Sequence, residues 1–217
     1  VLVTSCFKDD EAVTPHKPGN YVTDTVALTD SYKNQVYYNL HDSLAVSTVL
    51  KSSWDLGFEC SPLGWRVILN SASFMKSAYL EGQVFGSPAD TTGAKWIFNP
   101  SDGSADSLAI GKWFTISGND TIGTNRLMVI DRGMDEFGES LGFCQLVIDS
   151  LANGIYYFRV ATLDGKNPKS YAVSKISGNN HALFSITNPA SKVSEPGNTS
   201  WDLLFSQYTT LLFTDVG

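Results

Sequence analysis

Short segments in which apolar and polar residues alternate, separated by turn residues, run through most of the chain. The clearest is residues 155–163, IYYFRVATL, where aromatic and β-branched residues dominate. Such alternation is typical of a β-strand with one buried face. Shorter segments of the same kind occupy residues 35–40, 65–70, 127–130 and 145–148.

Turn residues separate these segments at regular intervals. In residues 164–168, DGKNP, glycine and asparagine readily adopt the positive φ of tight turns, and proline cannot donate a ladder hydrogen bond. Only residues 73–79 and 106–110 have a composition that allows one or two helical turns. The pattern therefore predicts an all-β chain, folded as an antiparallel β-sandwich or barrel-like sheet with few short helices.

One motif occurs twice. Ser53-Trp54-Asp55-Leu56, followed by a phenylalanine, returns as Ser200-Trp201-Asp202-Leu203, again followed by a phenylalanine. A β-prone segment precedes each copy. In a strand, Trp54 and Leu56 lie on one face and Asp55 on the other. We therefore expect Trp54 and Trp201 to be buried scaffold residues in equivalent settings.

The repeat has two interpretations: two related domains, or one recurring β-hairpin motif. On the first, residues 21–176 form an N-terminal β domain, and residues 177–217 begin a second domain that is cut short. The last five residues, FTDVG, resemble no natural ending. We therefore expect the chain to be a fragment at both ends.

The chain begins with a short apolar segment, two small residues and Cys6. This order is similar to the end of a bacterial lipoprotein signal, with cleavage before the cysteine. We expect residues 1–5 to be residual signal peptide and residues 6–20 to be a lipidated flexible tether. Lipid on Cys6 would then attach the protein to the membrane without a spanning helix. The Lys8-Asp9-Asp10 that follows resembles a signal for export to the cell surface.

Composition excludes several functional classes. With a net charge of −7, the 217-residue chain has no surplus of cations to neutralise the phosphates of nucleic acids. The sequence contains no Gly-x-Ser-x-Gly, His-Glu-x-x-His or P-loop motif, and no zinc-ligand spacing, so we expect no enzymatic activity and no structural metal. Cys60 and Cys144 are either a disulfide or two buried thiols.

The two Trp-Asp-Leu-x-Phe segments, the aromatic strand at 37–40 and the segment ending in Leu69-Asn70 together resemble the HmuY family, in its longer, two-copy form. This family comprises haem-binding outer-membrane lipoproteins of Bacteroidota. The resemblance implies a β-rich, lipid-anchored protein on the outer-membrane surface. It would take haem, free or from a haem-carrying host protein, and pass it to a TonB-dependent receptor.

Members of that family hold the haem iron with histidine or methionine side chains, which implies a search for such ligands here. The candidates are Met75, Met134 and His41, each in or next to a loop. His181 opens a strand and is interpreted as a partly buried edge residue, and Met128 lies inside an apolar strand. Two ligands from loops at one end of a sandwich can hold haem iron between them.

Two other functions remain open on the sequence alone. A lipid-anchored glycan- or protein-binding module would present Trp65, Trp96 and Trp113 as an exposed, roughly coplanar platform. An assembly or adhesion subunit would accept a partner strand at an exposed sheet edge.

Overall fold

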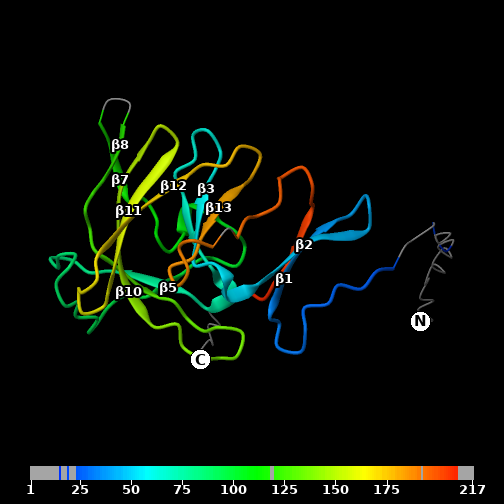
Figure 1. The fold of residues 1–217 in the computed structure, drawn as a ribbon, viewed down its shortest axis with the longest axis horizontal. Helices are drawn as coiled ribbons and strands as arrows, with labels where there is room; N and C mark the ends of the chain where they lie inside the picture. The colour runs from blue at the N-terminus through cyan, green and yellow to red at the C-terminus, as the bar shows by residue number, and fades with distance from the viewer. Residues whose placement is uncertain (1–14, 16–18, 20–22, 118–119, 192, 210–217) are drawn as a thin grey trace, which may run out of the picture.

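The computed structural model describes residues 15, 19, 23–117, 120–191 and 193–209. Antiparallel strands in three sheets make up most of this part of the chain (Figure 1). The helical segments within it are three short 3₁₀ turns, η1 (Lys51–Ser53), η2 (Ser71–Ser73) and η3 (Ala105–Ser107). The prediction of an all-β chain with few short helices is confirmed.

The largest sheet has eight strands and curls into half a barrel. Its main path runs β12-β11-β10-β9-β5-β6, and the β7-β8 hairpin joins it through β10. The strands are β5 (Lys76–Tyr79), β6 (Ile97–Phe98), β7 (Phe114–Ser117), β8 (Asp120–Gly123), β9 (Met128–Asp131), β10 (Phe143–Ala152), β11 (Ile155–Thr162) and β12 (Lys169–Ser174).

A second sheet of three strands packs on the first and forms a sandwich with it. Its order is β13-β3-β4, from β13 (His181–Phe184), β3 (Leu56–Glu59) and β4 (Val67–Leu69). Leu56 and Phe58 of β3 are 0% exposed. They belong to one cluster with residues of β9, β10 and β11, which places the main core between the two sheets.

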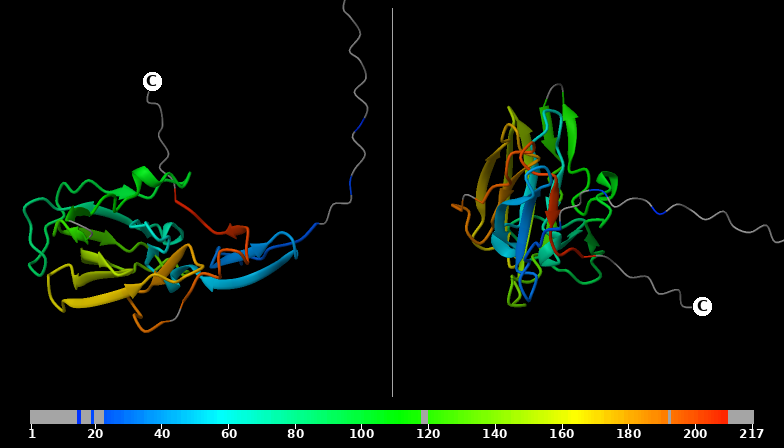
Figure 2. Two further views of the ribbon diagram at one scale, coloured as in Figure 1. Left: turned by 90° about the horizontal axis from the view of Figure 1, so that it is seen from above. Right: turned by 90° about the vertical axis from the view of Figure 1, so that its right-hand side faces the viewer.

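The third sheet, ordered β14-β1-β2, lies beyond one end of the sandwich (Figure 2). It consists of β1 (Asn34–Asn39), β2 (Leu44–Leu50) and β14 (Leu203–Phe205). Several of its large apolar side chains are exposed, among them Leu44 and Leu203. Val36, Tyr37 and Tyr38 of β1 are buried but do not belong to the main core cluster, so this sheet adds little to the core between the other two sheets.

Residues 73–79 differ from the helical turns expected there. Only Ser73 lies in a 3₁₀ turn, whereas Lys76–Tyr79 is β5, inside the large sheet. Ser77 and Ala78 are both 1% exposed. Both faces of β5 are covered at these two small residues, so the segment lacks the apolar–polar alternation by which a strand is recognised in sequence.

No helix in the described ranges is long and apolar enough to cross a membrane.

The two copies of the repeated motif exchange partner strands. β3, which follows Trp54, pairs with β13, so that Leu56 lies opposite Phe184. β14, which follows Trp201, pairs with β1, so that Leu203 lies opposite Tyr38. Each Trp-Asp-Leu segment is thus hydrogen-bonded to the strand that precedes the other copy.

The aspartates make the same backbone contacts in both copies. Asp55 donates its N–H to Phe184 O at 2.8 Å, and its Oδ2 accepts from the N–H of Ile186 at 2.7 Å. Asp202 donates to Tyr38 O at 2.9 Å, and its Oδ2 accepts from the N–H of Leu40 at 2.8 Å. Asp55 therefore caps the end of β13, and Asp202 caps the end of β1.

These pairings cross the expected boundary between residues 176 and 177. The described residues on its two sides share two sheets, although whether 177–217 begins a second domain stays a prediction. The expected signal-peptide remnant 1–5, Cys6 and nearly all of the tether 6–20 lie outside the described residues.

Candidate ligand-binding cleft

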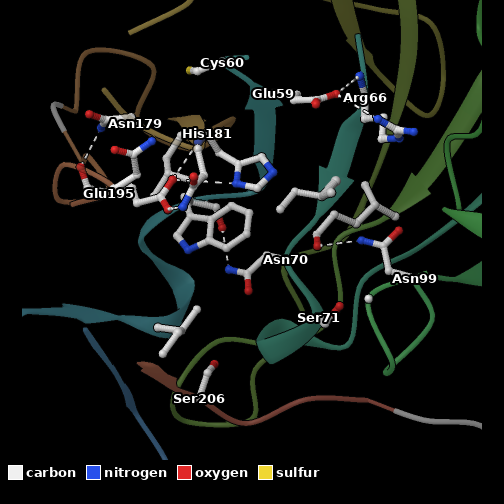
Figure 3. Close-up of a pocket in the computed structure, with 18 of the residues that line it drawn as sticks. Glu59, Cys60, Arg66, Asn70, Ser71, Asn99, Asn179, His181, Glu195 and Ser206 are labelled. Carbon is white, nitrogen blue, oxygen red and sulfur yellow. Dashed lines mark hydrogen bonds and ion pairs between the residues drawn. The ribbon is translucent and has the colours of Figure 1, made fainter. Parts of the chain in front are cut away.

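A cavity of about 1120 Å³ lies between the outer face of the β13-β3-β4 sheet and the β14-β1-β2 sheet (Figure 3). It is lined by both copies of the repeated motif, since Trp54 and Trp201 are among its walls. Ligand pockets in proteins commonly measure roughly 300–1,000 Å³. This cavity, hereafter the cleft, is therefore large enough for a bulky organic ligand.

Strand alternation builds the floor of the cleft. The core face of β3 carries Leu56 and Phe58, so its other face carries Gly57 and Glu59. Leu183 and Ile68 lie opposite Gly57 on the two neighbouring strands, and both line the cleft. A Cβ at Gly57 would lie 2.8 Å from Ile68 Cγ1, so glycine lets these two side chains close over the strand.

A charged row crosses the floor beside this apolar part. His181 of β13 lies opposite Glu59, and the N–H of Glu59 donates to Arg66 O on the other side. All three residues line the cleft. The floor thus changes from aliphatic to charged over the length of two residues of strand.

Aromatic side chains form the walls. Tyr37 and Trp201 meet edge to face, with ring centroids 4.9 Å apart. Trp54 donates its indole N–H to Gln35 Oε1 at 2.7 Å, which fixes the ring. Burial, together with the charge of Glu195, raises the pKa of Tyr37 far above its ordinary value, so this phenol stays neutral.

His181 is held from one side by a buried carboxylate. Its Nδ1 lies 3.6 Å from Oε2 of Glu195, a residue that is 5% exposed (Figure 3). The same Oε2 accepts from the backbone N–H of His181 at 2.6 Å, and Oε1 accepts from Asn180 Nδ2 at 2.9 Å. The hydrogen bond from the backbone N–H of His181 keeps the Glu195 carboxylate beside the imidazole, while the contact to Nδ1 is longer than an ordinary hydrogen bond and leaves Nε2 for another partner.

Glu59 is fixed within its own loop. Its carboxylate accepts from Ser61 Oγ and from the backbone N–H groups of Trp65 and Arg66, and Arg66 Nη1 lies 3.5 Å away. Burial raises the pKa of Glu59, but these hydrogen bonds and the charge of Arg66 outweigh burial. The net pKa is below the ordinary value, and the carboxylate is charged at neutral pH.

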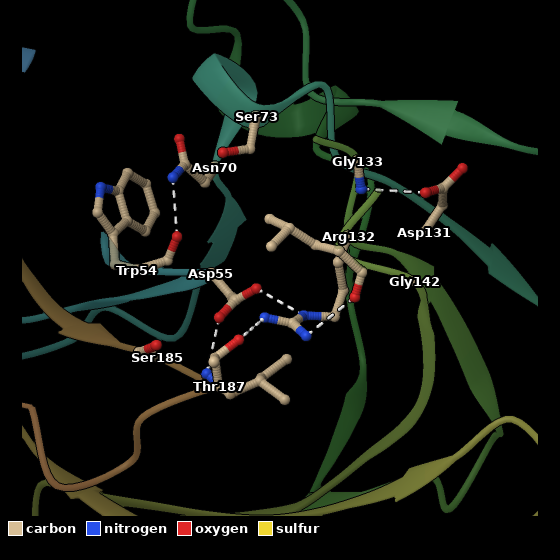
Figure 4. Close-up of polar contacts among 12 residues, drawn as sticks. Trp54, Asp55, Asn70, Ser73, Asp131, Arg132, Gly133, Gly142, Ser185 and Thr187 are labelled. Carbon is tan, nitrogen blue, oxygen red and sulfur yellow. Dashed lines mark hydrogen bonds and ion pairs between the residues drawn. The ribbon is translucent and has the colours of Figure 1, made fainter. Parts of the chain in front are cut away.

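A polar network behind the cleft holds β3 in place (Figure 4). Arg132 donates from Nε to Asp55 Oδ1 at 2.8 Å, from Nη1 to Leu141 O at 3.1 Å and from Nη2 to Thr187 Oγ1 at 2.5 Å. Asn70 donates to Trp54 O at 2.8 Å. The side chains of Asp55 and Arg132 are only 2% and 12% exposed, so this ion pair is almost completely shielded from solvent.

Gly133 allows the network to form. Its φ is +69°, and a Cβ there would lie 1.7 Å from Ser73 O. Only glycine accommodates that approach. The neighbouring Met134 then donates its N–H to Ser73 O at 2.8 Å.

The three predicted haem ligands lie elsewhere. Met75 is 1% exposed and belongs to the main core. Met134 is 48% exposed in the hairpin that follows Gly133, and His41 is exposed in the turn between β1 and β2. None of the three lines the cleft, and the structure does not bring them together. Their role as ligands stays a prediction.

His181 is a partly buried residue of edge strand β13, as expected, and it also lines the cleft, which the sequence analysis did not predict. The segment His181-Ala182-Leu183-Phe184 alternates, and Phe184 pairs with core residue Leu56. The alternation, which was available in the sequence, puts His181 and Leu183 on one face, and the pairing seen in the structure makes that face the outer one. Glu195 gave no such signal, because it lies in a loop without periodicity.

The two cysteines of the described residues are free thiols. Cys60 and Cys144 are both buried, and burial raises the pKa of both, that of Cys144 to about 12.

The three tryptophans outside the repeated motif form no exposed platform. Trp113 is 2% exposed and donates its indole N–H to Trp65 O. Within the described ranges, no group of three or more His, Cys, Asp or Glu residues is arranged to hold a metal ion.

Comparison of the chain with family models, with curated proteins and with solved structures found no match. The function therefore has to be argued from the cleft itself.

Proposed function

We propose that this protein binds haem in the cleft, as a surface lipoprotein of the HmuY type that passes haem to an outer-membrane receptor. The observation that carries the proposal is His181, whose imidazole lies in a large aromatic-lined cleft with its Nδ1 turned to buried Glu195. Histidines that ligate metals commonly donate their second ring N–H to a carboxylate.

The remaining walls suit a porphyrin. Trp201, Tyr37 and Trp54 line the cleft, with Trp201 the most exposed of the three, and Ile68 and Leu183 give an aliphatic floor. A flat, apolar macrocycle gains most from such surfaces. When bound, haem would supply an iron centre with redox and ligand-binding properties. The chain's own residues would bind the macrocycle, orient it and exclude water from it.

Four of the five asparagines that line the cleft, all but Asn198, donate to groups of the protein itself, which favours haem over a sugar. Asn70 donates from Nδ2 to Lys51 O and Trp54 O, and Asn99 donates to Leu69 O. Asn179 and Asn180 both donate to Glu195. A glycan-binding cleft needs free amides for hydroxyl groups, and these four amides already hold the protein together. We therefore rank the glycan- or protein-binding alternative second.

Haemin titration tests the proposal directly. We expect a Soret band that saturates with the wild-type protein, and a shifted band with weaker binding for His181→Ala, because that variant removes the imidazole. His41→Ala is the matched control, since His41 is an exposed histidine outside the cleft. Met75→Leu and Met134→Leu test the ligands that the sequence suggests. If either methionine variant lost the Soret band while His181→Ala kept it unchanged, the methionine and not His181 would be the iron ligand.

The lipid anchor needs a separate experiment. Cys6→Ala is expected to release the protein from the membrane fraction when the gene is expressed with its complete signal sequence, because acyl chains on Cys6 would supply the attachment. Cys60→Ala is the control for loss of a thiol as such. A Cys6→Ala protein that stays with membranes would refute lipidation at this residue.

A further inference from the structure

Arg66 occupies one end of the charged row on the cleft floor. His181, Glu59 and Arg66 follow one another across β13, β3 and the start of β4. Neighbouring strands lie roughly 4.8 Å apart, so the backbones of His181 and Arg66 are separated by about 10 Å. Both residues line the cleft, at points about two strand spacings apart.

The guanidinium of Arg66 has unused hydrogen-bonding capacity. Among the residues that the structure describes, its Nε is the buried side-chain nitrogen that has no hydrogen-bond partner. Nη1 is 3.5 Å from Glu59 Oε2, longer than an ordinary hydrogen bond, and the guanidinium carbon lies 5.3 Å from the Trp65 ring centroid. Since Ser61 Oγ and the backbone N–H groups of Trp65 and Arg66 already hold the Glu59 carboxylate, the guanidinium of Arg66 is not needed to fix it.

The other cation near the floor is already committed. Lys175 Nζ donates to the carbonyl oxygens of Ser61, Pro62 and Gly64, two of them at 2.6 Å. Glu195, the second carboxylate of the cleft, is occupied by His181 and Asn180. Of the charged groups that line the cleft, Arg66 is the one whose side chain has an N–H group without a hydrogen-bond partner.

We propose that Arg66 binds a carboxylate of the ligand in the cleft. This inference rests on the proposed function, and it adds the ligand class: a flat apolar molecule with a carboxylate at one edge. A guanidinium presents a planar fork of N–H donors that matches a carboxylate in bidentate fashion. In haem, the propionate groups provide that edge. If His181 held the iron and Arg66 held a propionate, these two residues would together orient haem in the cleft.

The test compares two probes that differ only in the carboxylates: haemin and haemin dimethyl ester. The wild-type protein is expected to prefer haemin by about 10- to 100-fold, the effect of one or two hydrogen bonds to a charged group. Arg66→Gln is expected to lose that preference by weakening haemin alone. Arg66→Lys keeps the charge without the fork, and we expect an intermediate ratio. Arg126→Gln is the control, since Arg126 lies outside the cleft and contacts Glu81.

The outcomes separate the two proposals. If the wild-type protein binds haemin in a His181-dependent way but does not discriminate against the ester, the role of Arg66 is wrong and haem binding stands. Equal weakening of both probes in Arg66→Gln also overturns that role. If neither probe binds, the proposed function falls, and the role of Arg66 with it. Circular dichroism checks folding, and should Arg66→Gln not fold, the ratio in the wild type and in Arg66→Lys decides.

Discussion

The two Trp-Asp-Leu segments make the same backbone contacts in different surroundings. Trp54 is 7% exposed and β3 is buried beneath the eight-stranded sheet, whereas Trp201 is only partly buried and two of the three β14 residues are exposed. The expectation that both tryptophans are buried is confirmed for Trp54 and wrong for Trp201. The motif specifies a strand and its cap. What covers that strand decides whether its residues become core or cleft wall.

The aspartates give the largest contrast. Asp55→Ala removes the partner of Arg132 and leaves a nearly buried cation, which typically costs about 3–5 kcal/mol of unfolding free energy. Asp202→Ala removes one hydrogen bond to an exposed backbone N–H and is expected to cost about 1 kcal/mol. Urea unfolding of both variants measures the difference.

Asp55→Asn serves as the intermediate variant, because an amide oxygen still accepts from Ile186. Losses of equal size for Asp55→Ala and Asp202→Ala would mean that the buried ion pair contributes nothing beyond the shared cap.

The tryptophans separate stability from binding. Trp54→Ala is expected to cost about 3–5 kcal/mol, because it empties a buried site. Trp201→Ala is expected to cost less, since part of the indole already faces solvent, yet to weaken haemin binding because the ring lines the cleft. Thermal unfolding and haemin titration of the same two proteins check this. If Trp201→Ala bound haemin as tightly as the wild type, Trp201 would not be part of the haemin-binding site.

The smallest effect concerns pH. The two copies differ at the residue that follows the motif, Glu59 in the first copy and Ser206 in the second. The pKa of Glu59 is lower in the folded protein than its unfolded value of roughly 4.3. Its contribution to stability is therefore present above that pH and is lost as the pH falls through the folded-state pKa.

Glu59→Gln is accordingly expected to flatten the loss of stability on acidification from about pH 5 to 3, within the range where carboxylates protonate. Ser206→Ala is the matched control and is expected to leave the acid profile unchanged. Identical profiles for Glu59→Gln and the wild type would show that Glu59 has no net role in acid stability.

The strands were predictable where alternation is strong, as in β11, because one face of that strand packs on the main core. β5 was missed because its buried residues are the small Ser77 and Ala78. The repeat was visible, but its exchanged pairing was not, since similarity between segments does not reveal which strands pair. The His181–Glu195 contact depends on a loop that only tertiary structure places beside β13.

The exchanged pairing also bears on how the chain folds. The contact between Leu40 and Asp202 joins residues 162 positions apart, and that between Asp55 and Ile186 joins residues 131 apart. Proteins dominated by such non-local contacts close long loops before they gain stabilising interactions, and they fold slowly. During synthesis, β1 and β3 must wait for β14 and β13, which are made much later. Until then each leaves an open strand edge, so this part of the protein is most prone to aggregate before β13 and β14 are made.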